Sequence, residues 1–199
     1  MSDAETIAVY DKRAQDYADR FSPLKEDRHL TAFIEKLPAA SPVLDLGCGP
    51  GNAAARLADA GFTVDAWDAA PGMVAMTARH NGVTARLAQF DDLDATRHYG
   101  GIWANFSLLH APRAAFPCHI AAISKALRPG GVFHIGMKTG TDADRDGLGR
   151  AYTYYSIAEL EDALLQTGFT VISQHTGQDA GFAGTVDPWV ILLAEKPSA

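Results

Sequence analysis

Cysteine, long apolar runs and clusters of positive charge are all scarce in this chain of 199 residues. The two cysteines, Cys48 and Cys118, cannot build a disulfide framework and lack the spacing of a zinc site, so we expect reduced thiols and no bound metal. No apolar stretch approaches the roughly 20 residues that cross a bilayer. Residues 1–20 are polar and charged, without the apolar core of a signal peptide. These absences predict a cytoplasmic protein without a membrane partner.

Basic residues are fewer than acidic ones, with 17 Lys and Arg against 24 Asp and Glu, which gives a net charge of −7. An acidic surface gains nothing from the counterion release that drives most nucleic-acid binding, so we expect no nucleic-acid partner. Hydrophobic residues make up 47% of the chain and charged residues 21%, which is typical of a folded domain. The length fits one domain over residues 1–199, as a monomer or a homodimer.

Short apolar segments alternate with amphipathic ones along most of the chain, which predicts an α/β fold. Such alternation gives parallel strands joined by right-handed crossovers, with helices on both faces of a doubly wound sheet. The last two strands have only the loop 176–188 between them, so we expect an antiparallel hairpin at one edge of a seven-stranded sheet. The strands are expected at 43–46, 63–67, 84–90, 101–106, 132–137, 169–175 and 189–195, and the helices at 4–20, 27–37, 52–60, 71–80, 113–127 and 156–166.

The most informative segment is a glycine-rich loop between the first strand and the following helix. Gly47, Gly49 and Gly51 fall within five residues there, with Cys48 between the first two. Glycine lets a backbone turn sharply and lets a ligand approach it closely, so we expect a nucleotide-type ligand on this loop. In a nicotinamide dinucleotide loop the third glycine would come one residue later. Asp45, just before the loop, would also repel a pyrophosphate, whereas it suits a ligand with a positively charged amino-acid group.

The segment 43–51 resembles the first motif of the Rossmann-like S-adenosylmethionine-dependent methyltransferases, an apolar strand followed by D-x-G-x-G-x-G. Asp45 and the three glycines match every fixed position of that motif. The resemblance implies S-adenosylmethionine as cofactor and a doubly wound sheet whose ligand lies at the carboxyl ends of the central strands.

Further segments extend the resemblance across most of the chain. It implies that Asp68, at the end of the second strand, binds the ribose hydroxyls, and that Met73 packs on the adenosine. After the third strand, either Gln89 or Asp91 is expected to bond the adenine amino group, with Phe90 nearby. The fourth strand, 101–106, resembles the strand whose end faces the methyl donor, so Asn105 near that end is expected to contact the cofactor.

Residues for the acceptor and its proton are expected after the fourth and fifth strands. His110 follows the fourth strand as a base or hydrogen-bond partner, or else as a histidine bonded only to the backbone. An insert over 138–155 follows the fifth strand, and its Tyr152 and Tyr155 are expected either to wall the acceptor site or to pack on the edge of the sheet. Arg145 and Arg150 would hold an anionic acceptor, or else pair at the surface with Asp142, Asp144 and Asp146.

The segment 1–38 resembles the lid helices that many small members of the family fold over the cofactor. Tyr10 and Tyr17 are seven residues apart and therefore share a helix face, for contact with the cofactor or for simple packing. The histidines are scattered, and no Asn/Asp-Pro-Pro-aromatic sequence follows the fourth strand. The length, the Leu108-Leu109-His110 sequence and the tyrosine-rich insert resemble those of small bacterial methyltransferases grouped with tellurite-resistance proteins. We expect methyl transfer to a small-molecule acceptor; the alternative is a non-catalytic sensor of S-adenosylmethionine or S-adenosylhomocysteine.

Overall fold

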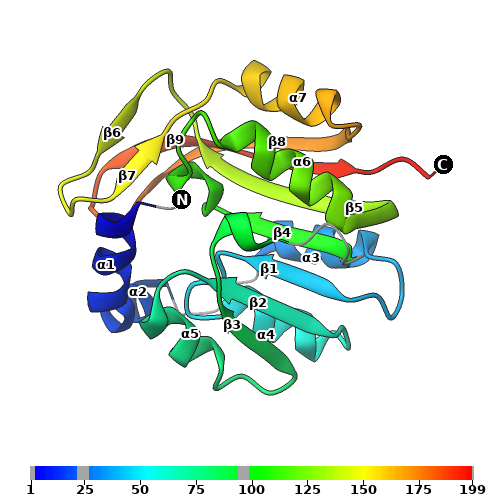
Figure 1. Ribbon diagram of the computed structural model, residues 1–199, viewed down its shortest axis with the longest axis horizontal. Helices are drawn as coiled ribbons and strands as arrows, with labels where there is room; N and C mark the ends of the chain where they lie inside the picture. Colours follow the sequence, from blue (N-terminus) through cyan, green and yellow to red (C-terminus); the bar gives the residue numbers. More distant parts are fainter. Residues whose placement is uncertain (1–2, 22–26, 94–98, 199) are drawn as a thin grey trace.

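The computed structural model describes residues 3–21, 27–93 and 99–198, and its centre is a seven-stranded sheet. The strand order is β3-β2-β1-β4-β5-β9-β8 (Figure 1). The first five of these pair in parallel, whereas β9 is antiparallel to both β5 and β8. The expected doubly wound sheet with a final antiparallel hairpin is therefore confirmed. Its strands are β1 (Val43–Leu46), β2 (Val64–Asp68), β3 (Val83–Leu87), β4 (Tyr99–Asn105), β5 (Leu127–Lys138), β8 (Thr170–Ala180) and β9 (Val186–Glu195).

Helices cover both faces of the sheet, with α6 and α7 in front of it and α3 and α4 behind it in Figure 1. Two large apolar clusters fill the spaces between these layers, one beneath α6 and α7 and the other beneath α3 and α4. The helices are α1 (Ala4–Lys12), α2 (Ala14–Phe21), α3 (Arg28–Lys36), α4 (Asn52–Asp59), α5 (Pro71–Thr77), α6 (Phe116–Ala126) and α7 (Ile157–Gln166), with the short 3-10 turns η1 (Phe90–Asp92) and η2 (Leu108–His110).

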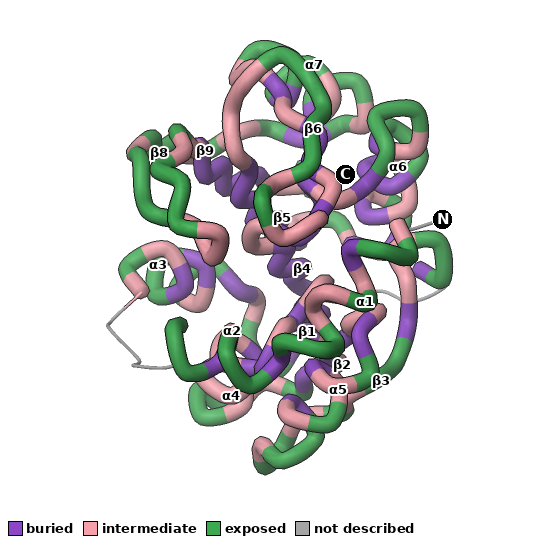
Figure 2. The backbone as a smooth tube through the Cα atoms, turned by 90° about the vertical axis from the view of Figure 1, so that its left-hand side faces the viewer, coloured by how far each residue is buried: buried purple, intermediate pink, exposed green. Residues whose placement is uncertain are grey.

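The central strand β4 is buried on both faces over all residues but its last, as its unbroken apolar pattern predicts. Figure 2 shows the buried backbone running through the middle of the sheet, with exposed segments on the outer helices and turns. In the described part of the chain no helix is long and apolar enough to cross a membrane.

The helix expected over 4–20 is interrupted, because Arg13 leaves the helical conformation at φ −110° and ψ 21°. Neither glycine nor proline marks the break, so the sequence pattern could not reveal it. Long-range contacts define it instead: the Asp11 carboxylate accepts a bond from the Gly72 N–H at 2.6 Å, and Ala14 packs with Met73. Of the segment expected as lid, residues 1–2 and 22–26 lie outside the described part of the chain.

Several other boundaries differ from the expected ones. The loop expected over 176–188 is mostly strand, because β8 continues to Ala180 and β9 begins at Val186. The insert 138–155 contains a small antiparallel sheet of β6 (Ala143–Arg145) and β7 (Ala151–Thr153). The third strand ends at Leu87, so that Phe90 belongs to η1, and β5 begins at Leu127. The β8–β9 and β6–β7 boundaries are set by pairing with the facing strand of the same hairpin, and a strand's tendency to form depends on such a partner.

Candidate active site

The glycine-rich loop leaves β1 in a conformation that only glycine adopts easily. Gly47 has φ +79° and Gly51 has φ +87°, in the left-handed region. A Cβ on Gly47 would overlap the Ser107 side chain, and a Cβ on Gly51 would lie 2.8 Å from Thr77 Oγ1. The two glycines therefore let the loop lie close against β4 and α5, at the carboxyl edge of the sheet.

Two buried carboxylates flank this loop. Asp68 accepts bonds from the Gly49 and Ala70 N–H groups, each at 2.9 Å, which anchors the loop to the end of β2. Asp45 is 2% exposed, and its Oδ2 has no hydrogen-bond partner among the described residues. Burial, together with the charge of Asp68, raises the pKa of Asp45 to about 7. A buried carboxylate with one unpartnered oxygen fits a positively charged ligand group, so the loop is suited to the ammonium of S-adenosylmethionine rather than to a phosphate.

Two cavities meet at the loop. The larger has a volume of about 630 Å³ and the smaller about 90 Å³. Both are lined by the loop, by the lid tyrosines and by the end of β4, through the shared residues Tyr10, Tyr17, Gly47, Gly49, Asn105 and Phe106. Asp45 and Cys48 line only the larger cavity, whereas Asp68 lines only the smaller one. One elongated ligand can therefore extend across the loop from one cavity to the other.

The smaller cavity gathers most residues expected near the adenosine. Met73, Gln89 and Phe90 line it, together with Trp67 and Ala88. Asp91 does not line either cavity; its carboxylate is about half exposed and lies 3.9 Å from Nδ1 of His119.

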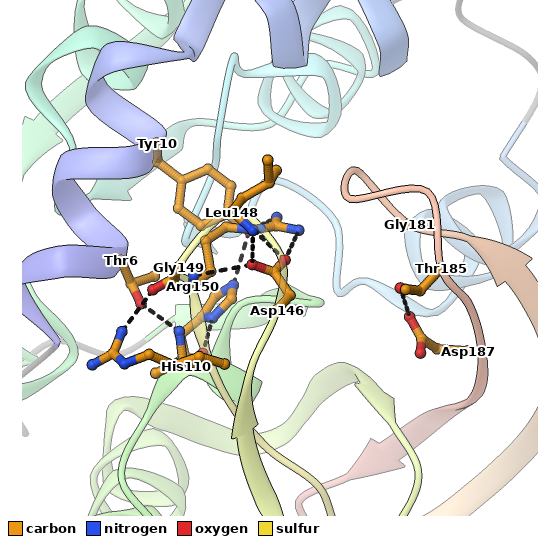
Figure 3. Close-up of polar contacts among 12 residues, drawn as sticks. Thr6, Tyr10, His110, Asp146, Leu148, Gly149, Arg150, Gly181, Thr185 and Asp187 are labelled. Atoms are coloured by element: carbon orange, nitrogen blue, oxygen red, sulfur yellow. Dashed lines mark hydrogen bonds and ion pairs between the residues drawn. The ribbon is translucent and has the colours of Figure 1, made fainter.

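The lid and the insert meet in a buried polar network, shown in Figure 3. The Tyr10 hydroxyl lies 2.9 Å from Nε2 of His110 and accepts a bond from Nη1 of Arg150 at 2.7 Å. Arg150 is 2% exposed and donates through Nε and Nη2 to the Asp146 carboxylate, at 2.9 and 2.6 Å. Of the two roles considered for Arg150, the structure thus shows the pairing with Asp146, inside the protein rather than at its surface.

The protonation of His110 follows from its partners. Nδ1 lies 2.6 Å from the backbone oxygen of Ala151, which can only accept, so Nδ1 carries the proton. Nε2 therefore has a free electron pair and accepts the hydrogen bond of the Tyr10 hydroxyl. Burial lowers the pKa of His110 to about 4, which keeps the ring neutral near pH 7. Because His110 lines only the smaller cavity, its route to the larger one is through Tyr10.

A second set of bonds fastens the lid to the insert at the surface. Arg145 donates to both carboxylate oxygens of Asp3, at 3.0 and 2.8 Å, and lies 3.3 Å from Glu5. The Ala151 N–H donates to the Thr6 hydroxyl at 2.8 Å. Arg145 thus pairs with acids of the lid rather than with Asp142 or Asp144, and it does not line either cavity.

The insert places its two expected tyrosines differently. Tyr152 lines the larger cavity, with its ring 4.7 Å from that of His110. Tyr155 packs instead against Phe116 at 4.5 Å, beneath Arg113, and lines neither cavity. The structure therefore does not bring Tyr155 to the site. Residues of an extended segment alternate between two faces, so the odd spacing of these tyrosines was a signal that both could not face one cavity.

The larger cavity also has a wall that the sequence did not indicate. Phe182 and Trp189 of the β8–β9 hairpin line it, together with an ion pair in which Nζ of Lys138 lies 2.7 Å from Asp187. The Asn105 side chain is held by His134 of β5, because Nε2 of His134 lies 3.1 Å from Oδ1 of Asn105. Among the described residues no three His, Cys, Asp or Glu side chains gather to hold a metal.

The chain was compared with protein-family models, with curated sequences and with solved structures. Residues 43–131 match the model of a methyltransferase domain. No curated protein sequence matches the chain. A solved structure of a 1,6-didemethyltoxoflavin N1-methyltransferase from Burkholderia thailandensis, with S-adenosylhomocysteine bound, has a TM-score of 0.77 at 22% identity, over 98% of this chain and 88% of that one.

Two further solved structures share the fold. A complex of DhpI with S-adenosylhomocysteine has a TM-score of 0.67 at 23% identity, over 98% of this chain and 96% of that one. TehB from Haemophilus influenzae has a TM-score of 0.73 at 17% identity, over 92% of this chain and 67% of that one. These structures show that the chain shares their fold. The family model and the glycine motif identify residues 43–131 as an S-adenosylmethionine-dependent methyltransferase domain. S-adenosylmethionine is its cofactor, as the first motif predicts.

Proposed function

We propose that the protein methylates a small-molecule acceptor that binds in the larger cavity beside the glycine loop. The observation that supports this most is the junction of the two cavities at one loop, which leaves space beyond the cofactor site for a second ligand. A volume of about 630 Å³ lies within the usual range of small-molecule sites, about 300–1,000 Å³. The lid and the β8–β9 hairpin both border this space, which favours a small acceptor over a nucleic acid. We further propose that the protein acts in the cytoplasm, as a monomer or homodimer.

Each part of the cofactor has residues suited to it. In this proposal Asp45 pairs with the ammonium group, Asp68 accepts bonds from the ribose hydroxyls, and Met73 and Phe90 pack on the adenine. Of the two candidates for the adenine amino group we favour Gln89, since it lines the smaller cavity and Asp91 does not. The backbone at Gly47, Cys48 and Gly49 allows close approach of the methionine portion, and Asn105 faces both cavities.

Bound S-adenosylmethionine supplies an electrophilic methyl group, and the protein must orient the acceptor and remove any proton that the acceptor loses. We propose that Tyr10 and His110 together remove the proton that the acceptor loses. The acceptor's proton passes to the Tyr10 oxygen while the Tyr10 proton moves to Nε2 of His110. The imidazolium that forms replaces the positive charge that leaves the cofactor during transfer. Arg150 and Tyr152 position Tyr10 and border the acceptor.

The proposal is tested by offering the purified protein S-adenosylmethionine and fractionated small-molecule extracts, and by measuring S-adenosylhomocysteine formation and a gain of one methyl group in a product. We expect a methylated small molecule with the wild type, and none with Asp68→Ala. Methylation only of nucleic acid or protein would contradict the proposal. Cofactor binding without turnover on any fraction would favour the alternative of a sensor.

A further inference from the structure

Besides Tyr10 and Tyr17, six aromatic side chains lie among the polar and charged residues that line the larger cavity. They come from α2, from β4 and the residue after it, from β7 and from the β8–β9 hairpin, and they are Phe21, Trp103, Phe106, Tyr152, Phe182 and Trp189. Such side chains offer a ligand large flat surfaces but few hydrogen bonds, so a ring-shaped acceptor can bury more area here than a flexible chain of the same size.

The two most buried cations of the cavity are already neutralised by protein carboxylates. The Lys138 side chain is 13% exposed, pairs with Asp187 and lies 4.1 Å from the centroid of the Tyr152 ring. Arg150 is held by the Asp146 carboxylate, and its guanidinium lies 5.4 Å from the Phe182 ring. An anionic acceptor would have to displace a carboxylate from one of these pairs. That exchange leaves a buried charge unpaired and is therefore unfavourable.

Trp189 is fixed in one orientation by three contacts. Its Nε1 donates to the Asp179 carboxylate at 2.8 Å, across the hairpin. Behind the indole is Gly177 of β8, where a Cβ would overlap the ring, so the absence of a side chain there makes room for Trp189. The Phe106 ring meets the indole edge to face, with centroids 6.4 Å apart. A ring held in this way loses little freedom when a ligand stacks on it.

Phe106 is itself in a costly conformation, with φ +54°, in the left-handed region that non-glycine residues rarely adopt. Such strain persists at functional sites where the surroundings hold it in place. It occurs here at the carboxyl end of β4, where both cavities meet and where the ring borders the acceptor space.

From these four features, and resting on the proposed function, we infer that the acceptor is a flat, uncharged aromatic or heteroaromatic compound that stacks on Trp189 and meets the Phe106 ring edge to face. Trp189 is then a specificity-determining residue, and Gly177 positions it.

The inference is tested with the protein saturated with S-adenosylhomocysteine and with four probes of matched shape. These are 2-naphthol, the saturated trans-2-decalol, the anionic 2-naphthoate and the cationic 2-naphthylmethylammonium, each titrated by ligand-observed NMR. We expect 2-naphthol to bind about tenfold more tightly than each of the others, since ring stacking contributes up to about 1.4 kcal/mol beyond area burial.

Two variants locate the probe site. Trp189→Leu removes the ring, and Gly177→Ala shifts it; both should weaken 2-naphthol about tenfold while the calorimetric affinity for S-adenosylhomocysteine stays within about twofold. Equal or tighter binding of the saturated or a charged probe would overturn the inference, as would the absence of binding by every probe at millimolar concentration. If the protein does not bind S-adenosylhomocysteine at all, the proposed function fails instead, so the two failures are distinguishable.

Discussion

Replacing Asp45 by asparagine should stabilise the ligand-free fold above neutral pH and remove most of the cofactor affinity. Burial raises the pKa of this carboxyl from 3.8 to about 7, with a further contribution from Asp68. One pH unit of difference between the folded and unfolded pKa corresponds to about 1.4 kcal/mol, so the ionised carboxylate costs the folded state up to about 4 kcal/mol. The cost is absent below the unfolded pKa, grows between pH 4 and 7 and is complete above pH 7.

The expected gain at pH 8 is therefore several kcal/mol at most, and less than half of that at pH 5. For a domain of this size each kcal/mol raises the melting temperature by about 2–4 °C, so we expect a rise of up to about 8–16 °C at pH 8 and less than half of that at pH 5. Loss of a buried charge partner for the cofactor's ammonium costs 2 kcal/mol or more, about 30-fold in affinity.

Thermal unfolding of Asp45→Asn at pH 8 and pH 5, with calorimetry of S-adenosylhomocysteine at pH 8, tests both expectations. Asp59→Asn, on the exposed surface of α4, is the matched control and should change neither quantity. A variant that is destabilised equally at both pH values, or that binds the ligand as tightly as the wild type, would refute the reasoning.

Three further predictions follow from the same site. The affinity of the wild type for S-adenosylhomocysteine should fall as the pH drops below about 7, since protonation of Asp45 removes the partner of the ligand's ammonium group. A calorimetric affinity that stays constant down to pH 5.5 would contradict this expectation. At position 106, Phe106→Gly should be more stable to denaturant than Phe106→Ala by about 1 kcal/mol, the reverse of the usual order, because φ is +54° there. Arg150→Met should lower the free energy of unfolding by about 1.5–3 kcal/mol at pH 7, since Oδ2 of Asp146 loses both guanidinium donors while Oδ1 keeps its two backbone N–H bonds; urea titration showing a change below about 1 kcal/mol would be inconsistent with the network.

The sheet and its nucleotide-type loop could be predicted from the sequence because their signals are local. Apolar strands, capped helices and three glycines in five residues each carry their meaning within a few positions. The break at Arg13 could not, since it lies beside a contact with the distant Gly72. The length of the β8–β9 hairpin could not either, since it depends on how far the two facing strands continue to pair.

Most residues that border the acceptor space could likewise not be predicted from the sequence. Trp189 and Phe182 reach the larger cavity only because the hairpin extends over it. Their sequence neighbourhood carries no motif, so only the strand pairing identifies them. Tyr155, by contrast, lies on the face opposite to Tyr152, a separation that strict alternation along the insert would have predicted.

The cofactor site at the glycine loop is tested most directly by calorimetric titration of the wild type and of Asp68→Ala with S-adenosylmethionine and S-adenosylhomocysteine. We expect micromolar binding of both ligands to the wild type and loss of that binding in the variant, whose fold is checked by circular dichroism. Absence of binding to the folded wild type, or unchanged binding to Asp68→Ala, would contradict the cofactor site described for the glycine loop.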